Sequence, residues 1–74
     1  MRIKVDLESN ALYLRLSESA IKESEEVHSG LIIDYDAEGH IVGLEILNIK
    51  EQFKIDDLIG LKLELPTTLN TSET

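Results

Sequence analysis

The sequence predicts an α+β domain that is mainly β, built on a small antiparallel sheet of four to five strands with one short helix. Two segments alternate apolar and polar residues around short turns, a third alternating segment lies near the C-terminus, and a helix signal precedes it. The predicted sheet therefore has two hairpins plus a C-terminal edge strand. At 74 residues the chain fits one domain, residues 1–66, and a Thr- and Ser-rich tail, residues 67–74, that we expect to be frayed.

The first predicted hairpin joins two alternating segments through a two-residue turn at Ser9-Asn10. This turn would pair Leu7 with Leu12 and would place the apolar side chains of both strands on one face. The opposite face would carry Tyr13 and Arg15 and would be the wetter side. The apolar set is Met1, Ile3, Val5, Leu7, Leu12, Leu14 and Leu16.

Residues 17–29 form a polar stretch without the apolar stripe of a packed helix. Glutamates dominate it, and Ile21 stands among charged and hydroxyl side chains. We expect a connecting loop here that enters the next strand.

The central predicted hairpin spans residues 30–47 and turns at Ala37-Glu38-Gly39, where the spacing of Asp36 and Gly39 favours a type I turn closed by a left-handed glycine. Pairing Asp36 with His40 would make both faces of the hairpin apolar. One short helix cannot cover two faces, so we expect a second copy of the chain to do so. In this register Glu45 would share a face with Leu31, Ile33 and Tyr35.

The C-terminal third predicts one helix, one turn and one strand. Asn48 and Glu51 have the spacing of a capping box, which would open a short helix with Ile49 and Phe53 on one side. Residues 56–60 resemble a turn that ends at a glycine. The final edge strand would contain Leu61, Leu63 and Leu65 and would stop at Pro66.

Composition excludes several classes of protein. The formal charge is −8, and residues 17–40 alone carry −6 from seven carboxylates and one lysine, so binding to a nucleic-acid backbone is not expected. No apolar run is long enough for a membrane span, and the N-terminus lacks the apolar region of a signal peptide. The chain has no cysteine, which is typical of the cytoplasm. A chain this short buries a small core, so we expect a homodimer or higher homo-oligomer.

One stretch has the spacing of an EF-hand calcium loop: Asp34-x-Asp36-x-Glu38-Gly39, with Glu45 at the twelfth position. An EF-hand needs flanking helices, whereas the residues on both sides favour strands. A turn with a bulge explains the same spacing, and adventitious cation binding there is the weaker alternative. The two histidines, His28 and His40, would not converge in this hairpin, so we expect no metal site and no cofactor.

Glu45 interrupts an apolar strand and is the most informative single carboxylate. It could be a satisfied structural group, a contact to a ligand or partner, or a group with a raised pKa. No serine, lysine or histidine has the spacing of a nucleophile or base beside it, so we expect no catalysis. The candidate partner or ligand contacts are Glu45, Tyr13, Tyr35, Asp34 and Asp36.

Two blocks resemble a small prokaryotic family of proteins of unknown function, domain of unknown function 2283. The first is Asn10-Ala11-Leu12-Tyr13-Leu14-Arg15-Leu16, and the second runs from Gly30 through Asp34-Tyr35-Asp36 to Val42-Gly43-Leu44-Glu45-Ile46-Leu47. The resemblance covers residues 3 to 48 and ends before the stretch after Lys50. It implies a compact β-rich domain with no assigned activity, and it implies a likeness to small acidic proteins encoded beside basic partners, including suspected antitoxins.

The sequence therefore predicts a small acidic protein-interaction or scaffolding module that acts as a homo-oligomer. An acidic loop and an apolar sheet face would mask a basic partner protein, in the manner of an antitoxin. The alternative is a small-molecule or cation-binding module that uses the Asp34 to Glu38 turn and Glu45.

Overall fold

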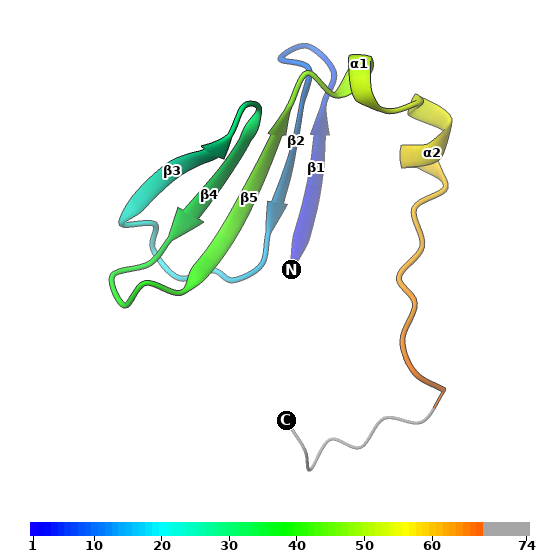
Figure 1. Ribbon diagram of the computed structural model, residues 1–74. Helices are drawn as coiled ribbons and strands as arrows, with labels where there is room; N and C mark the ends of the chain where they lie inside the picture. Colours follow the sequence, from blue (N-terminus) through cyan, green and yellow to red (C-terminus); the bar gives the residue numbers. More distant parts are fainter. Residues whose placement is uncertain (68–74) are drawn as a thin grey trace.

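The computed structural model describes residues 1–67, and within them it contains one five-stranded antiparallel sheet and two short helices (Figure 1). The predicted fold class is confirmed. No helix in residues 1–67 has the length and apolar content needed to cross a membrane. The elements are β1 (Arg2–Asp6), β2 (Ala11–Arg15), β3 (Glu23–His28), β4 (Leu31–Tyr35), β5 (Ile41–Leu47), α1 (Ile49–Gln52) and α2 (Ile55–Ile59).

The strand order is β1-β2-β5-β4-β3, so the last strand of the chain lies in the middle of the sheet. Strands β3, β4 and β5 form a meander, and β5 pairs with β2 to give four strands the order of a Greek key. The connection from β2 to β3 passes the ends of β5 and β4. There Leu16 and Ser17 donate backbone hydrogen bonds to the Val42 carbonyl, and Lys22 donates one to the Tyr35 carbonyl.

The first hairpin has a longer turn than predicted. Residues 7–10 form the turn, and Val5 lies opposite Leu12, so the register differs by two residues from the predicted one. Asp6 explains the difference, because its Oδ1 accepts hydrogen bonds from the backbone N–H groups of Glu8 and Ser9 at 3.1 and 3.2 Å. A shift of two residues leaves every side chain on its predicted face.

The central hairpin contains a bulge that the sequence analysis missed. Tyr35 pairs with Ile41 as predicted, but Asp34 pairs with Gly43, so Val42 is an extra residue on β5. Beyond the bulge, β4 is displaced by one residue from its predicted partners on β5.

This displacement exchanges the faces of β4 relative to β5, so the predicted hairpin with two apolar faces is wrong. Ile33 now lies opposite Leu44, and Ile32 lies opposite Glu45. Glu45 therefore does not share a face with Leu31 and Ile33, contrary to the prediction. Because directly paired residues lie on the same face of a sheet, eight apolar side chains from four strands gather on one side, while Ile32 lies on the other side with Glu45.

We call this side the apolar face. It consists of Ile3, Val5, Leu12, Leu14, Leu31, Ile33, Leu44 and Ile46. The other side, the polar face, carries Arg15, Tyr13, Glu45, Asp34 and Ser24 among others.

Strand β3 begins inside the stretch that was predicted to be a loop. It starts at Glu23 and pairs with β4 along the edge of the sheet, and every one of its residues is exposed. The alternating apolar pattern that marks a strand is absent because an exposed edge strand buries neither face. The loop prediction was wrong for these six residues.

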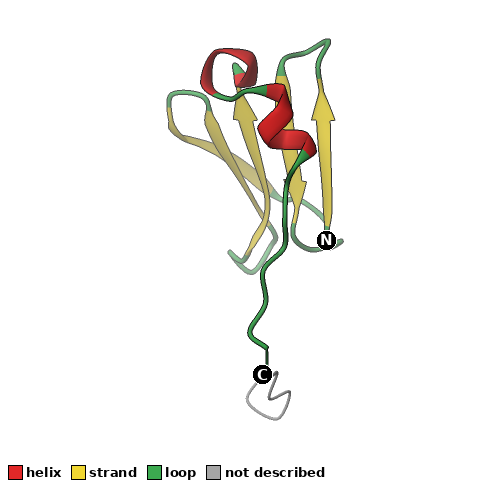
Figure 2. Ribbon diagram, turned by 90° about the vertical axis from the view of Figure 1, so that its right-hand side faces the viewer, coloured by secondary structure: helices red, strands yellow, loops and turns green. Residues whose placement is uncertain are grey.

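Helices α1 and α2 lie on the side of the apolar face, at one end of the sheet (Figure 2). Ile49 of α1 is fully buried, and Leu58 and Ile59 of α2 line a hollow with Val5 and Leu7. Helix α1 begins where it was predicted, but the capping box is wrong, since Asn48 makes no side-chain cap. Helix α2 occupies the place of the predicted turn at residues 56–60 and ends at a glycine.

The predicted C-terminal edge strand is wrong. Residues 61–66 are extended and exposed, and they pair with no strand of the described chain. Of the predicted tail, residues 68–74 lie outside the described residues.

Candidate functional site

A hydrogen-bonded cluster occupies the middle of the polar face and contains two predicted site residues, Tyr13 and Asp34. The Tyr13 hydroxyl donates to Asp34 Oδ2 at 3.2 Å, and the Ser24 hydroxyl donates to Asp34 Oδ1 at 2.5 Å. Asp34 is only 2% exposed. Both of its oxygens therefore have donors, as a buried carboxylate requires. We call Arg15, Tyr13, Asp34 and Ser24 the polar network.

Gly43 forms the floor under this network. It lies on β5, between Arg15 of β2 and Asp34 of β4. A Cβ atom at this position would lie 3.0 Å from both Asp34 Oδ2 and the Tyr13 hydroxyl. The absence of a side chain at Gly43 lets the tyrosine and the aspartate meet over the central strand.

Arg15 ties the network to the connection that leads from β2 to β3. Its guanidinium donates to the Tyr13 hydroxyl at 3.2 Å and to the carbonyls of Ser17 and Ser19, each at 2.6 Å. The hydrogen bond to Tyr13 raises the pKa of Arg15, and the charge of Asp34 contributes in the same direction. The Tyr13 hydroxyl therefore bridges the positive charge of Arg15 and the buried carboxylate of Asp34.

Glu45, another predicted site residue, lies beside this network without joining it. It pairs with Tyr13 on one side and with Ile32 on the other. It also lines an open hollow of about 250 Å³. The hollow is lined by Lys4, Asp6, Ser9, Ala11, Tyr13 and Glu45.

Tyr35 and Asp36 lie apart from the polar network, at the turn between β4 and β5. The Asp36 Oδ1 atom accepts hydrogen bonds from the backbone N–H groups of Glu38 and His40, each at 2.9 Å. The bond from His40 is the main cause that lowers the pKa of Asp36. The Asp36 side chain therefore stabilises the turn between β4 and β5. Tyr35 and Asp36 also line a second open hollow of about 400 Å³ together with Lys22, Glu23 and Glu25.

The carboxylates with calcium-loop spacing do not converge. Asp34 is bound by two hydroxyls on the polar face, and Asp36 is bound by the backbone of its own turn. Within residues 1–67 no three His, Asp or Glu side chains are grouped so as to hold a metal ion. His40 stands 3.4 Å from Asp36 Oδ2, whereas His28 contacts the Ser29 carbonyl at the opposite end of the hairpin.

A second hydrogen-bonded cluster, missed by the sequence analysis, surrounds Asn10. Its backbone adopts the left-handed conformation, with φ 58°, and its side chain caps α1 from the turn between β1 and β2. The Asn10 Oδ1 atom accepts from the Lys50 N–H at 2.8 Å, while its amide donates to Glu51 at 2.9 Å. Asn10 thus supplies the cap that Asn48 was predicted to provide.

Two members of the polar network, Arg15 and Ser24, and its floor, Gly43, were not predicted as site residues. Ser24 lay in the polar stretch assigned to a loop. Gly43 did carry a signal, because a glycine inside an apolar strand often marks a close approach of other groups. The hydrogen bonds of the network link β2 to β4 and β3 to β4, so it holds three strands together.

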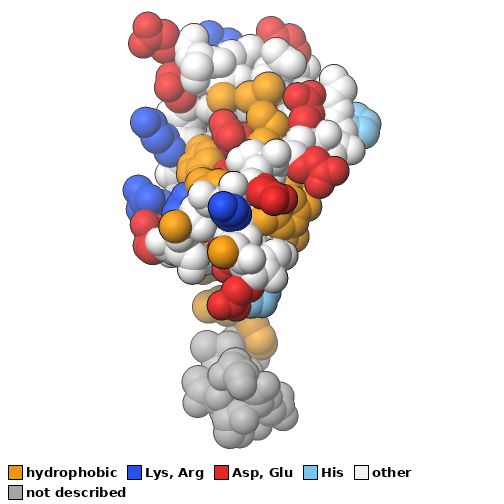
Figure 3. Space-filling model, turned by 90° about the vertical axis from the view of Figure 1, so that its left-hand side faces the viewer, with side chains coloured by type: hydrophobic (Ala, Val, Ile, Leu, Met, Phe, Trp, Pro, Cys, Tyr) orange, Lys and Arg blue, Asp and Glu red, His pale blue; other side chains and the backbone are white. Residues whose placement is uncertain are grey.

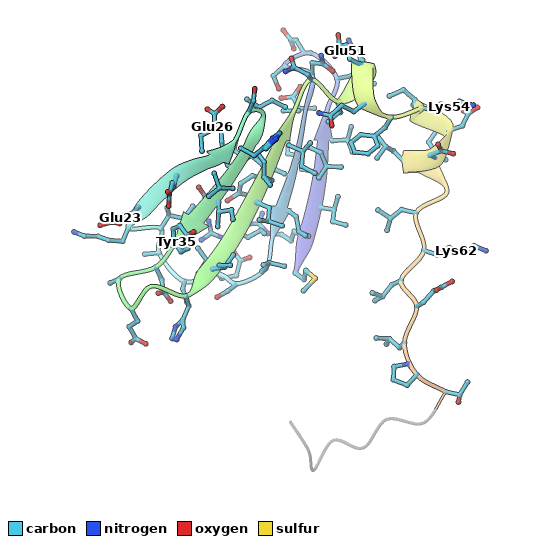
Figure 4. The ribbon with its side chains drawn as sticks, viewed as in Figure 1. Glu23, Glu26, Tyr35, Glu51, Lys54 and Lys62 are labelled. Atoms are coloured by element: carbon cyan, nitrogen blue, oxygen red, sulfur yellow. The ribbon has the colours of Figure 1, made fainter. Side chains whose placement is uncertain are left out.

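The exposed edge strand β3 presents an acidic surface. Glu23, Glu25 and Glu26 are all exposed, and we call these three residues the acidic edge. Glu23 and Glu26 project from β3 in Figure 4, and acidic side chains are spread over this side of the molecule in Figure 3.

The fold and these surfaces can be compared with known proteins. Comparisons with curated proteins and with solved structures gave no match. The family model described as "Protein of unknown function (DUF2283)" matches residues 2–50, which include all five strands and the start of α1. The resemblance found in the sequence is therefore confirmed, and the chain belongs to the DUF2283 family.

Proposed function

We propose that this protein is a non-enzymatic interaction module that associates with a second copy through the apolar face. One observation carries the proposal. None of the eight side chains of the apolar face is fully buried, and in residues 1–67 the buried hydrophobic core consists of Val42 and Ile49. A small domain with so little buried apolar surface gains stability when a partner covers the rest.

The proposed module also binds a basic protein through the acidic edge. The charge of residues 17–40 is −6, and the three glutamates of the edge stand on a terminal strand, whose outer side has no strand beside it in the described chain. Such a surface attracts and orients a basic partner, which agrees with antitoxin-like masking. Because the chain has no cysteine, we propose the cytoplasm as its compartment.

The small-molecule alternative has weaker support. The hollows beside Glu45 and Tyr35 measure about 250 and 400 Å³ and are open to solvent. Ligand pockets commonly have volumes of about 300–1,000 Å³ and bury most of the ligand surface. The hollow beside Glu45 is smaller than this range, and the hollow beside Tyr35 lies within it but does not enclose a ligand.

Analytical ultracentrifugation tests self-association with two variants matched in exposure. Ile3 belongs to the apolar face, whereas Ile21 lies in the connection from β2 to β3, and their side chains are 47% and 42% exposed. Ile3→Lys should shift the protein toward monomer, whereas Ile21→Lys should not, and circular dichroism should show that both remain folded. A wild-type protein that is monomeric at 100 micromolar would contradict the proposal.

The acidic edge requires its own test. A variant with Glu23, Glu25 and Glu26 replaced by lysine should lose a basic partner that the wild-type protein retains, and the wild-type complex should weaken as salt rises. Equal retention by both proteins would remove the proposed role of the edge.

A further inference from the structure

The segment that follows α2 has the pattern of a strand without a partner. Leu61, Leu63 and Leu65 are 53%, 79% and 61% exposed, and Lys62 and Glu64 alternate with them. Lys62 points away from the sheet in Figure 4, so the alternation of an extended chain directs its neighbouring leucines toward the side of the sheet. We call residues 61–65 the C-terminal segment.

Strand β1 offers a matching edge. It is a terminal strand of the sheet, so one side of its backbone has no strand beside it in the described chain. Its side chains alternate in the same way, with Ile3 and Val5 on the apolar face and Lys4 and Asp6 on the polar face. An edge of this kind accepts an added strand by backbone hydrogen bonding, and the alternate side chains then decide the register.

One antiparallel register satisfies every side chain of the C-terminal segment. It places Glu64 opposite Lys4 and Lys62 opposite Asp6, so both charged pairs have opposite sign. The same register sets the three leucines beside apolar residues of β1 and its turn. These apolar pairs are Leu65 with Ile3, Leu63 with Val5 and Leu61 with Leu7.

The two neighbouring antiparallel registers each place two side chains of like charge opposite each other. A shift of two residues in one direction places Lys62 opposite Lys4, and a shift in the other direction places Glu64 opposite Asp6. A parallel arrangement centred on the same residues produces both of these like-charged pairs. The charge pattern therefore selects one orientation and one register.

We propose that the C-terminal segment of each chain adds to β1 of a second copy in this antiparallel register. This inference rests on the proposed self-association and names the element that mediates it. Pairing within one chain would extend the sheet but would leave the middle of the apolar face partly exposed. In addition, the segment runs past the apolar-face side of its own sheet, in front of the strands and not beside β1 (Figure 2).

The exposed apolar surface is large enough for such an exchange. Nine large apolar side chains are exposed on β1 and its turn, on the helices and between them, and on the C-terminal segment: Ile3, Val5, Leu7, Phe53, Ile55, Ile59, Leu61, Leu63 and Leu65. At ~180 Å² for a fully exposed residue of this size, they present on the order of 900 Å², close to the roughly 800 Å² per partner of a standard interface.

Disulfide trapping tests the register and distinguishes pairing between two chains from pairing within one chain. The sequence has no cysteine, so the introduced cysteines can react only with each other. A Lys4→Cys chain mixed with a differently tagged Glu64→Cys chain should form a disulfide between the two chains under mild oxidation. The control pair, Arg2→Cys with Lys62→Cys, lies four residues out of register and should not form one. A single chain that carries both Lys4→Cys and Glu64→Cys should yield a covalent dimer. An intramolecular disulfide would overturn the exchange.

Charge exchange gives an independent test. Lys4→Glu or Glu64→Lys alone should raise the dimer dissociation constant by about fivefold, and the double variant should return it close to the wild-type value. Removal of residues 61–74 should weaken the dimer more than either single change. This inference would be overturned if the truncated chain still dimerises and the full-length Lys4→Cys and Glu64→Cys chains form no disulfide with each other. The proposed function would then remain intact. A wild-type monomer would overturn both.

Discussion

The Tyr13 hydroxyl donates a hydrogen bond to Asp34 across Gly43, and this contact joins β2 to β4 over the strand that separates them. Neither residue is paired with the other in the sheet. Their contact is a diagonal one that exists because the bulge at Val42 brings Asp34 opposite Gly43. The bulge thereby sets the composition of the polar network.

Removal of the Tyr13 hydroxyl should destabilise the fold. Tyr13→Phe leaves one oxygen of a buried carboxylate without its donor and removes an acceptor from Arg15, so the free energy of unfolding should fall by about 1–3 kcal/mol. Urea unfolding measures the change. Tyr35→Phe is the matched control and should stay close to wild type, since Tyr35 lies outside the network.

A methyl group at Gly43 should strain the same contact. Gly43→Ala puts a Cβ at 3.0 Å from two oxygen atoms, which should cost about 1–3 kcal/mol of stability. Gly60→Ala is the control, because the nearest atom to its Cβ would lie at 3.5 Å. In the double variant Gly43→Ala with Tyr13→Phe the losses should be less than additive. Strict additivity would contradict the proposed crowding.

The helix cap supplied by Asn10 can be separated from the backbone conformation of that residue. Asn10→Gly keeps the left-handed backbone accessible but removes the cap on Lys50, so stability should fall by about 1 kcal/mol. Asn10→Ala should lose about 1 kcal/mol more, since alanine disfavours a φ of 58°. Equal losses in the two variants, measured by thermal unfolding, would show that the backbone conformation contributes nothing.

Asp36 should make stability depend on acid pH. Backbone hydrogen bonds lower its pKa below the usual 3.8, so the folded protein binds this proton more weakly than the unfolded chain does. The stabilisation is therefore complete above the usual value and is lost as the pH falls through the lowered pKa. Asp36→Asn keeps an acceptor but cannot ionise. Its unfolding midpoint should lie below that of wild type at pH 6, and the gap should close by about pH 2.

The faces of the first hairpin could be predicted from sequence although its register could not. Alternation fixes which side of a strand a residue occupies, and a longer turn moved the pairing by two residues without changing sides. The turn length depended on the Asp6 side chain, which captures two backbone groups. Hydrogen bonds from a side chain to nearby backbone groups compete with the hydrogen bonds between strands. The alternation of apolar and polar residues does not show which of the two is more stable.

The central hairpin shows why the candidate site was only half predicted. Tyr13 and Asp34 were chosen, but their meeting depends on one extra residue in β5. A bulge exchanges the faces of everything beyond it, so pattern reasoning placed Glu45 on the wrong face. Ser24 was missed for a different reason, because an edge strand exposed on both faces has the composition of a loop.

The central position of β5 has a consequence for how the chain is made. During synthesis, β1 with β2 and β3 with β4 emerge as two separate ribbons that share no border until residues 41–47 follow. Two-stranded ribbons are marginal in water. Insertion of β5 between them converts both ribbons into one sheet in a single late step. A nascent chain that stalls on the ribosome before residue 47 should therefore hold no persistent part of the domain.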